Sequence, residues 1–298
     1  MFIIKHKKIF LSISAILVFV SVVLFFVFGF KIGIDFKGGA LTEVTYQIER
    51  PSQIETDSAV RELGLGTVLI QPTGELSYIV KTTDLTEEQH VALLQALSQN
   101  GLYPLEEKNF NSIGPSVGKE LTRKAIIAVT LVSLAIICFI AFAFRKVSKP
   151  VASWKYGVSA VIALVHDVVI SSGIFVLLGY FYGAELDTLF VVAALTILTL
   201  SVSDTIVIFD RIRENSRGKV GNDFKETVGK SLDQSFMRSI FTSLTVIIVL
   251  LSLYFFGPES TKYFALMLTA GMFFGTYSSI FLASPLIVLA EELQNKKK

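Results

Sequence analysis

The sequence predicts a polytopic α-helical membrane protein with six transmembrane helices and one extracytoplasmic α+β (ferredoxin-like) domain between the first and second helices. Hydrophobic residues make up 52% of the 298 residues, and the mean hydropathy is +0.62. Both values exceed those of ordinary soluble domains. The polar residues are also unevenly distributed, because residues 31–120 form one long polar segment after the first apolar run.

Six apolar runs are long enough to cross a hydrocarbon core that is about 30 Å thick. The first run follows Lys5, His6, Lys7 and Lys8, as the core of a signal peptide would. Its length and the lack of a clear small-residue cleavage site predict an uncleaved helix instead. The predicted spans are residues 9–30, 125–144, 157–178, 189–209, 240–256 and 263–290.

Lysine and arginine predict the orientation of these spans, because they concentrate in cytoplasmic loops. Basic residues precede the first span, fill the loops after the second and fourth spans, and end the chain, whereas the loop at 180–188 carries only Glu185 and Asp187. Both termini are therefore predicted to be cytoplasmic. The basic residues are Lys5, Lys7 and Lys8; Arg145, Lys146, Lys149 and Lys155; Arg211, Arg213, Arg217, Lys219, Lys225 and Lys230; and Lys296, Lys297 and Lys298.

The polar segment is predicted to fold outside the membrane in the order β-α-β-β-α-β, which is the ferredoxin-like pattern. Thr86 is the predicted N-cap of its second helix, Gly101 follows that helix, and Pro72-Thr73-Gly74 is a predicted turn. The segment has no catalytic cluster, which favours a binding or docking module. Strands are predicted at 40–49, 67–71, 76–81 and 103–110, and helices at 51–63 and 86–99.

These elements predict three parts of the chain. Residues 1–30 form the cytoplasmic N-terminus and the first transmembrane helix, and residues 31–122 form the extracytoplasmic domain. Residues 123–298 hold transmembrane helices 2–6 with the cytoplasmic loops and the C-terminus.

Several function classes are disfavoured by composition. Cys138 is the only cysteine, which excludes an intrachain disulfide and a multi-cysteine metal site. His6, His90 and His166 are far apart and show no metal-ligand spacing. The net charge of +2 gives no argument for a nucleic-acid partner, and the glycine-rich stretch 29–39 lacks the GK[ST] ending of a phosphate loop. We therefore expect no enzymatic activity, no cofactor and no metal.

Four charged or titratable residues lie in or near the predicted spans: Asp204, Arg238, His166 and Asp167. Asp204 is the most informative, because an ionised carboxylate near the middle of a spanning helix costs roughly 2.5–3.5 kcal/mol on insertion scales. Arg238 opens the predicted fifth span. Each residue lies in the cytoplasmic half of its span, so we expect the four to meet between helices. Hydroxyl residues flank Asp204 and follow Arg238.

Two interpretations of these residues stay open. In the first, Asp204 exchanges a proton and Arg238 tunes it, because burial favours the neutral acid and a nearby cation favours the carboxylate. In the second, the charges form a static pair that fixes helix packing, Arg238 extends toward the membrane boundary, and His166 and Asp167 form a buried hydrogen bond. Gly271 and a second glycine four residues later predict close helix packing, within the chain or with another subunit.

Five motifs occur in order along the chain: IGIDFKGG, IGPSVGKEL, HDVVI, SVSDTIVIFDRIREN and RSIFTSLTV. Together they resemble the SecF family of bacterial protein-export membrane proteins, over about residues 5 to 290. The resemblance implies a multi-pass protein of the cytoplasmic (inner) membrane, and it places the family's intramembrane acid and arginine on Asp204 and Arg238. The resemblance covers the SecF half alone, so SecD is expected to be a separate chain.

The resemblance also implies partners and a task. SecF pairs with SecD to give twelve pseudo-symmetric spans, similar to resistance-nodulation-division transporters, and the pair associates with the SecYEG channel and often with YajC. It promotes late steps of the export of unfolded preproteins, using the proton gradient or, in some marine bacteria, sodium. The alternatives are a resistance-nodulation-division exporter of small molecules or lipids, and a scaffold without ion coupling.

Overall fold

A computed structural model describes residues 2–144 and 151–295 of the chain. These residues form two compact units: a helical unit built from the N-terminal segment up to Lys31 and everything from Ile127 onward, and an α+β unit, Ile32–Ile126. The predicted basic residues Arg145, Lys146 and Lys149 and the three C-terminal lysines lie outside the described residues.

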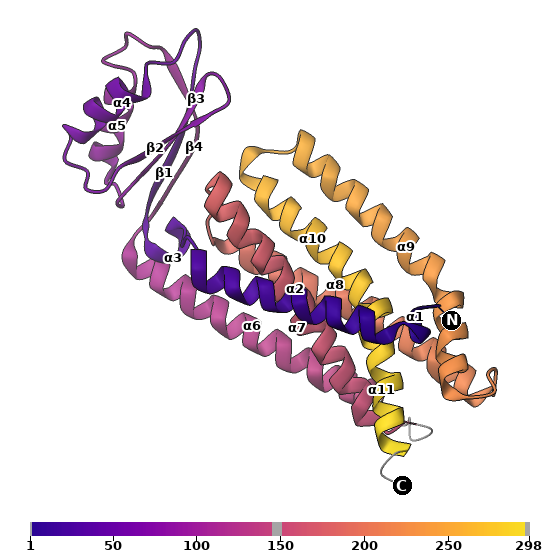
Figure 1. Cartoon of the computed structure of the whole chain (residues 1–298). Coiled ribbons are helices and arrows are strands. Elements are labelled where there is room, and N and C mark those ends of the chain that lie inside the picture. The colour runs from indigo at the N-terminus through magenta and orange to yellow at the C-terminus, as the bar shows by residue number, and fades with distance from the viewer. Residues whose placement is uncertain (1, 145–150, 296–298) are drawn as a thin grey trace. The chain divides into compact units, whose positions relative to one another are not determined.

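The α+β unit contains a four-stranded antiparallel sheet in the order β2-β3-β1-β4, which confirms the ferredoxin-like prediction (Figure 1). A short helix, α3, precedes the sheet. Alternate residues of β1 and β3 are buried in a hydrophobic core that the strands share with the two longer helices of this unit. This alternation is expected of a sheet with one buried face. The elements are α3 (Ile34–Lys37), β1 (Gly39–Tyr46), α4 (Gln53–Arg61), β2 (Leu69–Thr73), β3 (Ser77–Thr82), α5 (Glu87–Leu97) and β4 (Leu105–Ile113).

Local signals explain where these elements begin and end. The predicted N-cap of α5 is confirmed, because Thr86 and Gln89 form a capping box. Gly101 follows that helix with a φ of +92°, a conformation that glycine adopts without strain. The turn predicted at Pro72-Thr73-Gly74 was wrong, because the strand continues further than expected. Pro72 and Thr73 belong to β2 and pair with β3. Proline is tolerated there because β2 is an edge strand, whose outer side needs no hydrogen-bond donor.

Among the described residues, six helices are long and apolar enough to span a membrane, which confirms the predicted number. The last of them is not one continuous α-helix, because a π-helical segment at Ser279–Ala283 separates α10 from α11. The spans are α2 (Lys7–Phe28), α6 (Pro115–Ala143), α7 (Ser153–Tyr182), α8 (Thr188–Arg217), α9 (Phe224–Phe256), and Glu259–Asn295 with α10 (Lys262–Ser278) and α11 (Ser284–Asn295). A short helix, α1 (Phe2–Lys5), precedes them.

Several helices extend beyond the predicted spans, among them α6, α8 and α9. Helix α9 begins at Phe224 rather than near residue 240, so Arg238 lies well inside a helix and does not open it. Asp223 caps this start, since its carboxylate accepts the backbone N–H of Glu226 at 2.7 Å. Buried Val228 and Leu232 recur one turn apart and hold the added turns against the core.

Five of the six basic residues predicted in the fourth-to-fifth loop are correspondingly helical, and Lys219 lies in the turn between α8 and α9. Arg211, Arg213 and Arg217 lie in α8, and Lys225 and Lys230 lie in α9.

The predicted glycine packing is confirmed within the chain. A Cβ atom added at Gly271 would overlap the side chain of Ile197, and one at Gly275 would lie 3.2 Å from Cβ of Ser201. Both neighbours belong to α8, so the two glycines let the backbone of α10 approach α8 closely. This approach brings the polar residues of α8 and α10 within hydrogen-bonding distance.

Candidate functional site

A first polar cluster surrounds Asp167 on α7, which is 0% exposed. Its Oδ1 contacts Nδ1 of His166 at 2.8 Å. Its Oδ2 accepts hydrogen bonds from the hydroxyls of Ser201 on α8 and Ser278 on α10, the latter at 2.7 Å. Both carboxylate oxygens are therefore occupied, and the residue links three helices of the bundle.

His166 is buried beside this carboxylate. An ionised carboxylate can only accept a hydrogen bond, so with Asp167 ionised the Nδ1 atom of the imidazole is the donor of this contact. The opposite nitrogen, Nε2, is buried and has no hydrogen-bond partner among the described residues. The imidazole stacks on Tyr277 with ring centroids 6.1 Å apart, and the Tyr277 hydroxyl donates to the carbonyl of Phe10 at 3.4 Å. The cluster thus extends to α2.

Asp204 on α8 forms a second cluster. It is half-buried, and its Oδ1 accepts a hydrogen bond of 2.5 Å from Ser239 on α9. Its Oδ2 is buried and has no hydrogen-bond partner in the described part of the chain. A buried carboxylate oxygen without a donor is costly, since the lost hydration is not replaced. This atom is consequently the open position of the site, able to take a proton, a cation or an additional donor.

Hydroxyl groups line the helix interface between the two carboxylates. Thr205, next to Asp204, shares a 2.7 Å hydrogen bond with Ser279. Ser279 is adjacent to Ser278 of the first cluster and begins the π-helical segment. Such segments occur frequently at functional sites. The two acids thus lie in one polar layer of the bundle, although no direct bond between them is found among the described residues.

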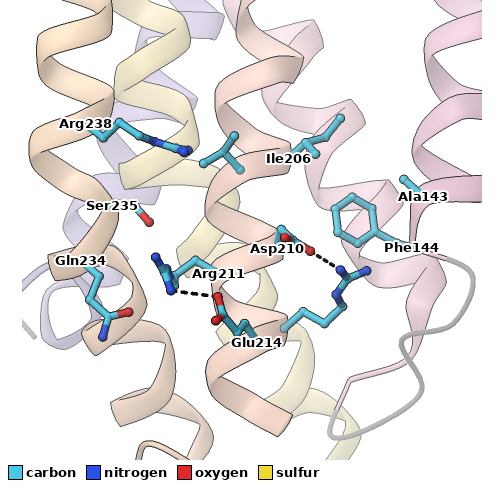
Figure 2. Close-up of a pocket in the computed structure, with 11 residues that line it drawn as sticks. Ala143, Phe144, Ile206, Asp210, Arg211, Glu214, Gln234, Ser235 and Arg238 are labelled. Atoms are coloured by element: carbon cyan, nitrogen blue, oxygen red, sulfur yellow. Dashed lines mark hydrogen bonds and ion pairs between the residues drawn. The ribbon is translucent and has the colours of Figure 1, made fainter. Parts of the chain in front are cut away.

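Arg238 is exposed and immediately precedes Ser239 on α9. Within the described residues it forms no ion pair, to Asp204 or to any other acid, at a distance of 4.0 Å or less. Arg238 lines a cavity of about 320 Å³ between α8 and α9. Figure 2 shows its guanidinium extending from α9 toward α8 near Ile206.

The remaining charges of this cavity are paired with one another. Arg211 contacts Glu214 at 2.8 Å, and Arg213 contacts Asp210. The pair of Arg211 and Glu214 is visible in Figure 2. Among the charged residues that line this cavity, Arg238 is therefore the one that forms no ion pair with a carboxylate in the described part of the chain.

The structure brings Arg238 close enough to Asp204 for its charge to act on that carboxylate, without an ion pair of 4.0 Å or less among the described residues. His166 and Asp167 form one bonded pair, and Asp204 contacts α9 through the neighbour of Arg238 rather than through Arg238 itself. Three serines of the site, Ser239, Ser278 and Ser279, were missed. The sequence signal that could have identified Ser278 and Ser279 is the series of small residues that continues from Gly275 along the last span.

Among the residues described, no group of three or more histidine, cysteine, aspartate or glutamate side chains is arranged to hold a metal ion. The donors near Asp204 are instead one carboxylate and several hydroxyls.

Comparisons with known proteins give a consistent result. The family described as "Protein export membrane protein SecD/SecF, C-terminal" matches residues 94–293. Among curated relatives, "Protein translocase subunit SecF" of Thermobaculum terrenum is 41% identical, over 96% of this chain and 92% of that protein. The protein of the same name from Anaerolinea thermophila is 34% identical, over 97% and 94%.

Two solved structures are also similar. One is the crystal structure of SecDF, "a translocon-associated membrane protein", from Thermus thermophilus, with a TM-score of 0.80, 29% identity and 98% of this chain covered. The other is SecDF in a "Super-membrane-facing form", with a TM-score of 0.66, 30% identity and 99% covered. This chain spans only 38% and 39% of those two SecDF chains.

Proposed function

This chain belongs to the SecF family of protein translocase subunits, and we propose that it acts with a separate SecD chain to couple an ion gradient to late steps of protein export. The relatives of its own length carry the SecF name, and the longer SecDF chain is described as translocon-associated. Since this chain matches less than two fifths of SecDF, a SecD partner would supply the remainder.

The observation that carries ion coupling is the half-occupied carboxylate of Asp204. Ser239 holds one oxygen in place, and the other is buried with no hydrogen-bond partner among the residues that the structure describes. An acid that carries this cost inside a membrane-spanning helix is typical of a proton or ion pathway. The exchanged ion in this proposal is a proton, with sodium as the alternative.

Helix α9 provides the means of coupling. It carries both Ser239, which donates to Asp204, and Arg238, whose guanidinium forms no ion pair of 4.0 Å or less among the described residues but acts on Asp204 through its charge. A shift or rotation of α9 therefore changes the hydrogen bond and the distance of the cation from Asp204 together. Approach of the guanidinium favours the carboxylate and proton release, and its withdrawal favours proton uptake. The cavity beside Arg238 would admit water and the ion from one side.

Asp167 and His166 take a positioning role in this proposal. Both oxygens of Asp167 already accept hydrogen bonds, so the residue has no open position for an exchanged ion. Its bonds fix α7, α8 and α10 as a frame, against which α9 moves. This assignment departs from the ion-coupling role that the sequence suggested for the pair.

The surroundings of the proposal follow the family. The chain would lie in the bacterial inner membrane with both termini in the cytoplasm, associate with the SecYEG channel and YajC, and act on unfolded preproteins without being an enzyme. The positive-inside distribution of lysine and arginine supports this orientation. It puts the α+β unit on the side where the exported chain emerges, and we propose that this unit contacts that chain.

The test replaces Asp204 by asparagine in cells whose only SecF is this chain. Asparagine keeps an oxygen that accepts from Ser239, so the abundance of the protein should stay normal. Export of a reporter preprotein, followed by pulse-chase at low temperature, should fall to the rate of cells that lack the chain. The matched control is Asp233→Asn, which removes an exposed carboxylate of α9 that does not line the cavity and should leave export unchanged.

Two results would overturn the proposal. Normal export with Asp204→Asn at normal abundance would exclude coupling through this acid. Loss of the protein itself in Asp204→Asn would favour the scaffold interpretation, in which the acid serves only helix packing.

A further inference from the structure

A second, larger groove lies between the start of α7 and the end of α11, with a volume of about 610 Å³. It shares no lining residue with the Asp204 site or with the cavity beside Arg238. Its two walls run in opposite senses, since α7 begins where α11 ends. The residues near those ends therefore form the mouth of the groove, and residues further along each helix form its deeper part.

The polarity of the groove changes along its length. Lys155, Trp154 and Gln294 lie at the mouth, and the deeper lining is aliphatic, with Ile162 on α7 and Leu286 on α11. Trp154 and Ile162 on α7 are 66% and 44% exposed, and Leu293 on α11 is 54% exposed, so both walls are accessible from outside the bundle. A cationic and aromatic end followed by a hydrocarbon surface is the polarity order of a phospholipid. Tryptophan and lysine are also the residues that favour the headgroup level of a membrane.

Lys155 is already positioned for a ligand. Its ammonium donates to the backbone carbonyl of Ala290 at 2.7 Å and to Oε1 of Gln294 at 2.9 Å. An ammonium has three N–H donors, and no described residue accepts the third. The two internal bonds fix the side chain, so a headgroup phosphate would bind without ordering a flexible lysine.

We infer that this groove binds an anionic phospholipid, with the phosphodiester on Lys155 and Trp154 and one acyl chain along Val158, Ile162 and Leu286. Basic pockets between transmembrane helices are known to bind acidic headgroups, and one lysine near an anionic membrane surface contributes about 1 kcal/mol, or about a fivefold change in affinity. The inference does not depend on the role of Asp204.

Native mass spectrometry of the full chain in a mild detergent tests it. Titration with phosphatidylglycerol and with phosphatidylcholine of the same acyl chains should show tighter binding of one phosphatidylglycerol molecule. Lys155→Met should abolish this preference, a loss of about fivefold, and Lys155→Arg should retain it. The matched control is Lys8→Met, which removes an exposed lysine near the start of α2 and leaves the groove intact.

A second variant covers the case in which Lys155→Met unfolds the protein. Ile162→Trp fills the deeper groove and keeps the lysine, so it should weaken binding of both lipids. Equal binding of the two lipids by the unaltered chain, or a preference that survives Lys155→Met, would overturn the inference. It would also fail if inorganic phosphate removed the preference while Ile162→Trp had no effect, because the site would then take a free anion. Loss of the lipid when the chain is copurified with SecD would assign the groove to a partner helix.

Discussion

Replacing Asp167 by alanine should destabilise the helical unit strongly, because this side chain is the shared acceptor of three helices. The substitution leaves the hydroxyls of Ser201 and Ser278 and Nδ1 of His166 without their acceptor in a fully buried site. At about 1 kcal/mol for each lost hydrogen bond the cost is about 3 kcal/mol, and breaking buried polar pairs typically costs about 3–5 kcal/mol. The serines recover part of this by bonding to helix carbonyls, so about 3 kcal/mol is the expected loss.

A loss of this size is measurable by thermal unfolding of the purified chain in detergent. For a protein of comparable size, 1 kcal/mol lowers the Tm by about 2–4 °C, so Asp167→Ala should lower it by roughly 6–12 °C. Ser171→Ala is the matched control, because Ser171 is buried on the same helix and donates only to the backbone carbonyl of Asp167. It should change the Tm by no more than about 3 °C. A Tm of Asp167→Ala equal to that of the control would refute the assignment of Asp167 as a frame residue.

Two further predictions concern the helix contact and the α+β unit. Gly271→Ala should cost about 1–3 kcal/mol through overlap with Ile197, and adding Ile197→Ala should give a double variant that is less destabilised than the sum of the single variants; additive Tm changes would contradict the contact. Burial raises the pKa of Tyr46, whose hydroxyl donates to the carbonyl of Leu97 at 2.9 Å. The folded state thus favours the neutral phenol, and its stabilisation is complete below the ordinary pKa of 10.0 and declines above it. The Tm difference between the unaltered chain and Tyr46→Phe should therefore shrink between about pH 9 and about pH 11, and a constant difference would be the contrary result.

The spans could be predicted because each apolar run is long and the membrane leaves few alternatives to a helix. The start of α9 could not, because its first turns carry Lys225, Glu226 and Lys230 on their exposed side and read as a polar loop. What stabilises those turns is the contact of Val228 and Leu232 with the core, and hydropathy averaged over a window does not detect one buried face.

The candidate site was predictable in part for a similar reason. Asp204 is conspicuous because a carboxylate in an apolar run is expensive wherever its side chain points. Its partner Ser239 is one of many serines, and only the packing of α9 on α8 selects it. Ser278 and Ser279 are harder still, because the π-helical segment that starts at Ser279 shifts which residues of the last span share a face.

The contacts of α2 with the last span have a consequence for the order in which the molecule is assembled. Lys7 pairs with Glu292 at 2.5 Å, and the ring of Phe10 packs on Phe281 with centroids 4.7 Å apart. Helix α2 therefore acquires part of its packing from a segment that is synthesised much later. At about 5–20 residues per second, this partner emerges on the order of half a minute later. Until then α2 can pack against α7, which is synthesised before the last span, and its largely unburied apolar surface is compatible with lipid.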